Sequence, residues 1–313
     1  MNLHSLKKHF PWMTLVALTL FVGILDPNFL RLDNLIALAG DISTLFIMAL
    51  GITFVIYIGS IDLSAQSVAN MITVLATLFL AQLGWFAAPV CIAIGALFGL
   101  VSGYVSNRLK VPSFIATLAV GGIALSVGQY ASGQKALYMD AGLRNEAFGW
   151  IIGTTAGLPR EMIIAFVLLV VALIIERRTV LGRALQAIGA GEPAAIASGL
   201  RVNRYKMIAF AISGAFAAMA GLIFAVKLSG GSPVMANGFL LPAIVAVLVG
   251  GTPLTGGVGG VLNTFIGALI VAVIRTSMLY LNVPPTAQQI FFGLVLVGAI
   301  ALTIDRSKVR TVK

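Results

Sequence analysis

Apolar residues in this chain gather into long runs that polar residues interrupt only briefly. Most runs approach the roughly 20 residues that a helix needs to cross a bilayer. The pattern predicts an all-α, polytopic membrane protein that forms one transmembrane domain over residues 1–313, with the short eighth segment tilted, re-entrant or broken. The ten segments are 10–25, 34–58, 66–83, 87–106, 114–131, 161–175, 207–227, 239–251, 260–281 and 286–304.

The positions of lysine and arginine predict the orientation of these helices. Cytoplasmic loops of membrane proteins carry an excess of Lys and Arg. With a cytoplasmic N-terminus, the inside segments hold 14 of the 20 Lys and Arg residues, the outside segments hold five, and Arg275 lies within a span. We therefore expect both termini to be cytoplasmic, with one sizeable loop outside at about 132–160 and one inside at about 176–206.

The first segment admits two interpretations. It follows Lys7 and Lys8 and is short for a span, as the apolar part of a cleaved signal peptide would be. The residues after it, Asp26, Pro27 and Asn28, do not form the small-residue cleavage site that a signal peptide needs. We interpret it as a retained first helix.

Composition indicates lipid as the main solvent and excludes several functions. Hydrophobic residues make up 59% of the chain and charged residues 10%, with a mean hydropathy of +1.05, whereas a soluble domain carries about 25% charged residues. The net charge of +10 does not indicate a nucleic-acid partner, because the basic residues lie between apolar runs. With only Cys91, and with both His4 and His9 before the first span, we expect no disulfide, metal site, cofactor or catalytic centre.

Two distant stretches of the chain repeat a short pattern. Gly95-Ala96-Leu97 is followed by Val111-Pro112, and Gly267-Ala268-Leu269 is followed at the same spacing by Val283-Pro284. The fourth and ninth segments run in opposite directions, so the pattern suggests two inverted five-helix halves, as in many transporters. Chance is the alternative, because Gly, Ala, Leu and Val are abundant here.

The chain lacks the phosphate-binding motif of an ATPase. No G-x-x-x-x-G-K-[ST] occurs, and the glycine cluster at 250–257 contains no lysine to reach a phosphate. If ATP drives this protein, the ATPase is another polypeptide.

The cytoplasmic loop predicts a short helix over 193–198. Pro193 suits the first position of a helix, Gly199 suits a left-handed C-terminal cap, and Glu192 lies at the positive end of the helix dipole. Two turns are too few for a helix that is stable alone in water. This helix is therefore docked on a partner or is an amphipathic elbow on the bilayer, and spacing alone does not separate the two.

The same loop resembles the coupling loop of ribose-type ABC sugar permeases. The similarity runs from about residue 33 to 305 and includes, in order, 51–67 with Ile61-Asp62-Leu63-Ser64, then 111–118, 203–204, 213–221 and 248–259. The matching residues of the loop are Thr179, Gly182, Arg183, Ala187, Ile188, Gly189, Glu192, Ala194, Ala195, Ser198 and Gly199.

The resemblance implies a multi-pass protein of the bacterial inner membrane, with loop 132–160 in the periplasm. It implies a core of two permeases, the second an identical copy or a paralogue, with two copies of an ABC ATPase subunit beneath it. A periplasmic solute-binding protein would deliver a monosaccharide or similar solute. It further implies that ATPase coupling involves Gly189, Glu192, Pro193, Ala194, Ala195, Ser198 and Gly199.

Two departures from the family pattern put a ribose-like substrate in doubt. Gln66 stands where the family often has glycine after Leu-Ser-x. Many sugar members have an acidic residue before the Ala-Ile that precedes the Gly-Gly-Thr segment, but residues 239–244 contain none.

Polar residues in or beside the spans are candidates for the translocation pathway. Asp62, expected at the cytoplasmic end of the second segment, is either an anchor that holds backbone amides near the pathway or an N-cap of the third helix. Arg275 is either a functional charge or snorkels to the outer interface. The pathway candidates are Asp62, Ser64, Asn70, Asn263 and Gln288.

Two rival functions remain to be weighed against an ABC permease. An ion-coupled secondary transporter needs an acid or histidine inside a span, and Asp41 and Asp62 are the only acids near the second and third segments. A membrane-embedded enzyme needs a convergent catalytic set, and no Ser–His, HExxH or paired-carboxylate arrangement occurs. We therefore rank the ABC permease first.

Overall fold

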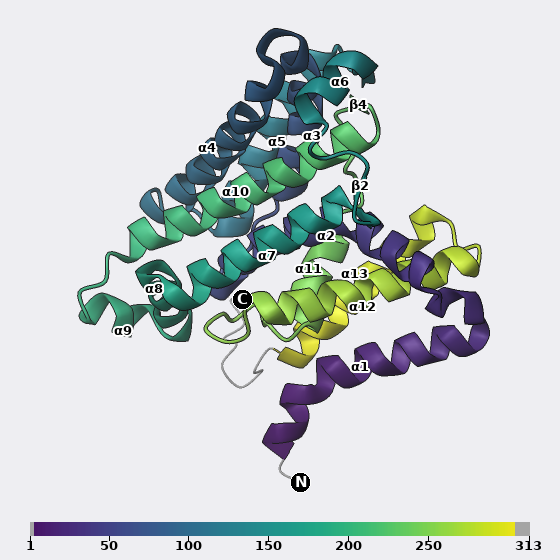
Figure 1. Cartoon of the computed structure of the whole chain (residues 1–313). Helices are drawn as coiled ribbons and strands as arrows, with labels where there is room; N and C mark the ends of the chain where they lie inside the picture. Colours follow the sequence, from purple (N-terminus) through teal and green to yellow (C-terminus); the bar gives the residue numbers. More distant parts are fainter. Residues whose placement is uncertain (1–2, 304–313) are drawn as a thin grey trace.

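The computed structural model describes residues 3–303 and is built almost entirely of helices (Figure 1). Each of the ten predicted segments is a helix, although Ile304 of the last segment and the predicted cytoplasmic Arg306, Lys308, Arg310 and Lys313 lie outside the described residues. The ten helices are α1 Leu3–Leu25, α2 Leu32–Tyr57, α3 Ala65–Leu83, α4 Ala87–Arg108, α5 Ser113–Ser132, α7 Arg160–Arg178, α10 Val202–Lys227, α11 Leu240–Val249, α12 Val261–Tyr280 and α13 Pro285–Thr303.

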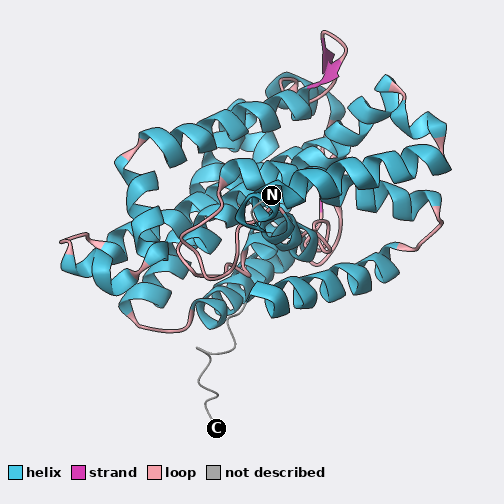
Figure 2. Ribbon diagram, turned by 90° about the horizontal axis from the view of Figure 1, so that it is seen from below, coloured by secondary structure: helices cyan, strands magenta, loops and turns pink. Residues whose placement is uncertain are grey.

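Shorter elements occupy the connections between these helices. Strands β1 and β4 form one antiparallel pair, and β2 and β3 form another. The all-α class fits, because the strands are only two residues long each and helices fill the view in Figure 2. The connecting elements are η1 Pro27–Leu30, η2 Gly84–Phe86, β1 Leu137–Tyr138, α6 Ala141–Phe148, β2 Thr154–Thr155, β3 Leu158–Pro159, α8 Val180–Ala190, α9 Glu192–Ala197 and β4 Gly230–Gly231.

Within residues 3–303, five helical stretches are long and apolar enough to cross a membrane: Leu32–Tyr57, Ala65–Arg108, Ser113–Ser132, Val202–Lys227 and Val261–Leu279. The second of these contains both α3 and α4, which meet at η2. Three shorter apolar helices are Pro11–Leu25, Leu240–Val249 and Thr286–Ile300. Helix α7 is similar in length to α5 but carries charged residues at both ends. The chain is thus a multi-pass membrane protein.

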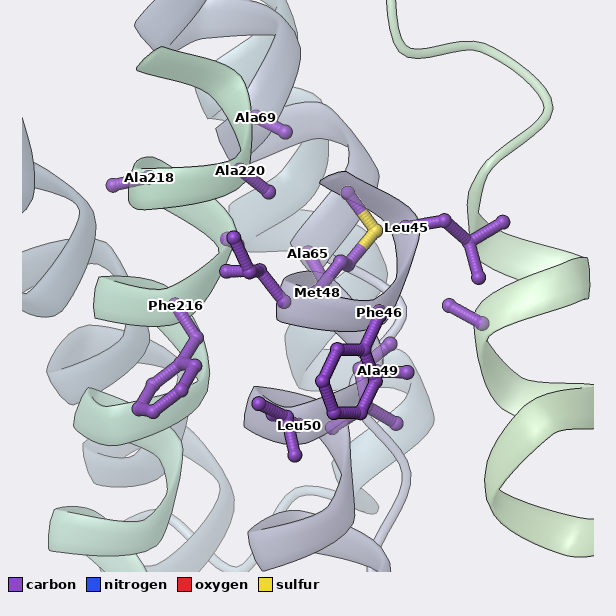
Figure 3. Packing of buried hydrophobic residues seen from close by; sticks show 14 of the residues in the cluster. Leu45, Phe46, Met48, Ala49, Leu50, Ala65, Ala69, Phe216, Ala218 and Ala220 are labelled. Carbon is purple, nitrogen blue, oxygen red and sulfur yellow. The ribbon is translucent and has the colours of Figure 1, made fainter. Parts of the chain in front are cut away.

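Helix α2 is the centre of the bundle. Its residues from Ile42 to Tyr57 are all buried, and α10, α12, α7 and α11 pack around it. Figure 3 shows Leu45, Met48 and Leu50 of α2 among side chains of the neighbouring helices, with Phe216 of α10 to one side. A helix that is apolar on all faces, as α2 is, is expected in such a buried position.

Glycines of α4 bring that helix into close contact with α10. A Cβ at Gly95, Gly99 or Gly103 would meet the backbone or Cβ atoms of α10, from Ala218 at one end of the contact to Met207 at the other. Small residues four apart allow helix backbones to approach closely in lipid. The small residues at 95–103 and 213–221 therefore lie at a close contact between the two helices.

Helix α10 also defines two ends of the bundle. It begins beside α9 and ends beside β4, and α6 lies near β4 (Figure 1). We refer to these as the α9 end and the α6 end.

Candidate functional site

The chain between α2 and α3, residues 58–64, turns back into the bundle and lies along the first two turns of α5. Gly59 has a φ of +70°, which reverses the chain after α2. The backbone N–H of Ile61 donates to Ser113 Oγ (3.2 Å) and that of Leu63 to Thr117 Oγ1 (3.1 Å), and Ser64 lies against Gly121. Helix α3 therefore begins inside the bundle.

Asp62 occupies the centre of this turn and is fully buried. Its Oδ1 accepts hydrogen bonds from the Ser64 backbone N–H (2.8 Å) and hydroxyl (2.5 Å), and its Oδ2 accepts from Ser213 Oγ of α10 (2.7 Å). The carboxylate holds a backbone amide just before α3 and joins this turn to α10. The N-cap position of α3 is Ser64 rather than Asp62, so the N-cap interpretation is wrong. The position of Asp62 also differs from our expectation of the cytoplasmic end, since Ser213 lies near the middle of α10.

The chain between α10 and α11, residues 228–239, runs down α3 in the opposite direction. Gly231 packs against Thr73 and Thr77 of α3, and Thr73 Oγ1 donates to the Ser232 carbonyl at 2.9 Å. Asn70, one turn earlier on α3, then accepts from the Ala236 N–H through its Oδ1 at 2.6 Å. This linker thus reaches the middle of the bundle from the α6 end.

Gln66 and Asn70 of α3 hold the last part of this linker. Both donate to the side-chain oxygen of Asn237, Asn70 at 2.8 Å and Gln66 at 3.3 Å. The Gln66 Oε1 accepts from the backbone N–H groups of Gly238 (3.1 Å) and Leu240 (3.3 Å). Two irregular segments therefore meet around the first turns of α3. Membrane transporters place solute sites at irregular segments of this kind.

Three of the five pathway candidates take part in this arrangement, and two do not. Asp62 and Ser64 bind each other, and Asn70 binds the linker. Gln288 donates to the carbonyl of Val283, just before α13 (3.2 Å). Its neighbour Gln289 donates instead to the Gly238 carbonyl in the linker (3.0 Å). Asn263 lies beside Gly250 and Gly251, away from the other four.

Sequence reasoning missed three members of this polar cluster. Asn237 and Ser213 lie in stretches rich in Gly, Ala and Ser, whose composition gives no sign of a site. Gln66 did carry a signal, because it replaces the glycine that the resembled family often has. Within residues 3–303, no three His, Cys, Asp or Glu side chains come close enough to share a metal ion.

A cavity of about 310 Å³ lies near the α6 end, between α2, α10 and α12. Lys227 contacts Asp41 (2.8 Å) and Glu161 (3.4 Å) at its edge. The half-buried Arg275 guanidinium lies over the Phe239 ring at 5.6 Å from its centroid. Arg275 thus faces the cavity next to the α10–α11 linker.

The predicted short helix is confirmed as α9, Glu192–Ala197, shifted by one residue. Pro193 lies in its first turn, and Gly199 has a φ of +80°. The N–H of Leu200 donates to the Ala195 carbonyl (3.1 Å), as in a Schellman cap. Glu192 also forms an ion pair with Lys206 of α10 (2.6 Å).

Gly189 lies near the end of α8, the helix before α9, and packs closely against the body of the protein. A Cβ at Gly189 would overlap the Tyr57 carbonyl at the end of α2 and the Gly257 nitrogen in the loop before α12. The Gly257 N–H itself donates to the Tyr57 carbonyl (2.9 Å). Gly189 therefore makes a contact inside the chain, whereas the rest of the predicted coupling set lies on α9 or just after it, at Ser198 and Gly199.

Most of α9 faces away from the rest of the chain. Ala195 is buried, but Pro193, Ala194, Ser198 and Gly199 are exposed, and Ile196 is 58% exposed. An apolar face of this kind on a helix too short to be stable alone is typical of a docking surface.

Comparison with known proteins identifies the relatives of this chain. Residues 34–300 match the family model described as the permease component of branched-chain amino acid transport systems. The ribose import permease protein RbsC of Haemophilus influenzae is 34% identical over 92% of this chain and 90% of its own length. The RbsC of Escherichia coli K12 is 33% identical (95% and 92%), and the L-arabinose transport system permease protein AraH of that strain is 32% identical (95% and 90%). No solved structure matches this chain.

Proposed function

The chain belongs to the family of permease components of branched-chain amino acid transport systems, and from that premise we propose that it is the membrane-spanning subunit of an ATP-driven importer. Its cargo is a monosaccharide or a similar small polar solute. The observation that carries the proposal is the polar cluster between two irregular linkers, in a chain that matches sugar permeases over nearly its whole length.

The chemistry of the cluster favours a neutral polyol over an amino acid. Apart from Asp62, the side chains of the cluster are the amides of Gln66, Asn70 and Asn237 and the hydroxyl of Ser213, all of them uncharged. The one carboxylate there, Asp62, already accepts three hydrogen bonds. A zwitterionic amino acid would find no free charged partner at this site. Moving it there from water would therefore carry a large desolvation cost.

All ten helices that the hydropathy pattern predicts, α7 and α11 included, take part in crossing the inner membrane. The α9 end is cytoplasmic and the α6 end periplasmic, with both termini in the cytoplasm. The distribution of Lys and Arg supports this orientation. The separation of α9 from α6 along α10 agrees with it, because the two predicted loops then lie on opposite faces (Figure 1).

The two halves, α1–α5 and α7 with α10–α13, are an inverted repeat. The packing of α10 on α4 corresponds to that of α2 on α12, and the packing of α3 on α5 corresponds to that of α11 on α13. Each half has an irregular linker before its third helix, and the two linkers enter from opposite ends. This is the arrangement expected of broken helices in transporters.

Two copies of a separate ATPase drive a pair of permeases, with a second copy of this chain or a paralogue as the other permease. A periplasmic binding protein supplies the solute. The ATPase docks on α9 through Pro193, Ala194, Ile196 and Ser198. Its movement passes through α8 and Gly189 to Tyr57, the residue before the linker that carries Asp62.

An ion-coupled carrier is the second candidate, since Asp62 is an acid within the bundle. Both of its oxygens are already occupied by Ser64 and Ser213 within the described chain. This satisfied geometry suits a structural anchor better than a group that exchanges an ion in each cycle.

Uptake into proteoliposomes tests the proposal. Vesicles would contain this chain with an ATPase and a binding protein from neighbouring genes, and a panel of labelled pentoses, hexoses and branched-chain amino acids would be offered. We expect sugar uptake that needs ATP and stops when the ATPase is left out. Uptake by the chain alone, driven by a proton or sodium gradient, would instead support the second candidate.

A further inference from the structure

A second hollow lies at the α9 end, outside the polar cluster. This groove, of about 810 Å³, is bounded by the last turns of α4, the residues joining α4 to α5, helix α9 and the first turns of α10. Its lining residues are Leu100, Arg108, Lys110, Glu192, Ile196, Leu200, Arg201, Val202, Asn203, Arg204, Met207 and Ile208.

The groove carries an unbalanced positive charge. Arg108, Lys110, Arg201 and Arg204 line it and are all exposed. Its single acid, Glu192, is already paired with Lys206. None of the four cations has a carboxylate within 4 Å in the part of the chain that the structure describes. The groove therefore suits an anionic ligand.

The rest of the groove is apolar and is ordered along the helix axes. Leu100 precedes Arg108 by eight positions on α4, which corresponds to about 12 Å along a helix. Exposed Tyr104 lies between them, and Met207 and Ile208 follow the cations in the same direction along α10. Cations at one end and lipid-facing apolar side chains at the other match a phospholipid, which has a phosphate above an acyl chain.

We propose that this groove binds an anionic phospholipid of the cytoplasmic leaflet. The phosphate is held among Arg108, Lys110, Arg201 and Arg204, and the start of one acyl chain lies along Leu100 and Ile208. Basic pockets between helices on the cytoplasmic side suit such headgroups. The assignment of the leaflet rests on the proposed function, because that function sets which end is cytoplasmic.

The groove brings a bound lipid next to α9. Ile196 and Leu200 form one wall of the groove, so a bound lipid contacts the segment on which the ATPase is proposed to dock.

Native mass spectrometry of the full chain after delipidation tests the binding directly. The ligands are phosphatidylglycerol, phosphatidylcholine and inorganic phosphate. In the test variant Arg108→Gln is combined with Arg204→Gln, one from each wall. In the matched control Arg178→Gln is combined with Arg183→Gln, two exposed cations of the same loop region that do not line the groove.

We expect phosphatidylglycerol to bind more tightly than phosphatidylcholine, and the test variant to lose about thirtyfold in affinity at about 1 kcal/mol for each cation removed. The control should change by less than about threefold. Equal losses in both variants, equal binding of the two lipids, or competition by inorganic phosphate would overturn the proposal, as would displacement of the lipid by purified ATPase. The assay needs neither ATP nor cargo, so its failure is distinct from failure of the uptake experiment.

Discussion

At the scale of single residues, the site depends on a few polar side chains that are hydrogen-bonded to one another. Asp62, Asn70 and Ser213 are buried, whereas Asn237 is exposed. Asp62 and Asn70 could be selected from the sequence, because polar residues in apolar surroundings stand out. Their partners Ser213 and Asn237 could not, since they lie more than 150 positions away and only the fold brings them close. The same limit applies to Gln288, whose neighbour Gln289 reaches the linker instead.

Two substitutions of Asp62 distinguish the role of its hydrogen bonds from the role of its charge. Asp62→Ala leaves the Ser64 N–H, the Ser64 hydroxyl and the Ser213 hydroxyl without their acceptor, and each unsatisfied buried group costs about 1–3 kcal/mol. Asp62→Asn keeps an acceptor for Ser64. We expect thermal unfolding of the purified permease in detergent to show a much lower Tm for the alanine variant than for the asparagine variant. Equal damage in both would show that the charge itself is needed.

At the scale of elements, hydropathy predicted all ten helices, because a lipid-exposed helix must be apolar over its whole length. It did not predict the paths of the two linkers. Gly59 lies just after α2 and Gly238 just before α11, both with positive φ, but the path of each linker depends on hydrogen bonds to α5 and α3. The short helix α9 was predictable because its caps are local in sequence.

The linker before α11 should depend on two side chains of α3. Asn70→Ala removes the acceptor of the Ala236 N–H, and Gln66→Ala removes the acceptor of the Gly238 and Leu240 N–H groups. Because both hold one linker, we expect the double variant to deviate from additivity by about 0.5–3 kcal/mol in unfolding free energy. Strictly additive effects would contradict a shared role.

The contact of α8 with the body can be tested at neighbouring glycines. Gly189→Ala forces a methyl group into the Tyr57 carbonyl, and overpacking of this kind costs about 1–3 kcal/mol. Gly191→Ala is the control, because its nearest neighbour would be 3.9 Å away. We expect lower uptake and a lower Tm for the first variant and near wild-type values for the second. Wild-type uptake by Gly189→Ala would remove α8 from the coupling route.

At the scale of the whole molecule, charge and hydropathy together predicted a multi-pass protein and an orientation. Resemblance to a family added the partners, which no pattern within one chain can supply. The inverted repeat was weakly marked by Gly95 and Gly267, and the corresponding helix contacts now support it.

Labelling of single cysteines tests the orientation. The native Cys91 is fully buried and should not react. The cells are intact, but their outer membrane does not exclude the reagent. We expect a maleimide that cannot cross the inner membrane to label Lys135→Cys, and to label Ser198→Cys only after the inner membrane is permeabilised. Both positions are exposed, so the reverse pattern would invert the proposed topology.

The exposed face of α9 offers the most direct test of the central claim, which is that a separate ATPase binds this helix and drives the permease through it. ATP-driven uptake and co-purification of the ATPase would be measured for Ile196→Asp and for the control Val180→Asp, whose side chains are 58% and 60% exposed. The account predicts that Ile196→Asp reaches the membrane but loses both the ATPase and uptake, while Val180→Asp keeps both. Full uptake with a bound ATPase in Ile196→Asp would contradict it.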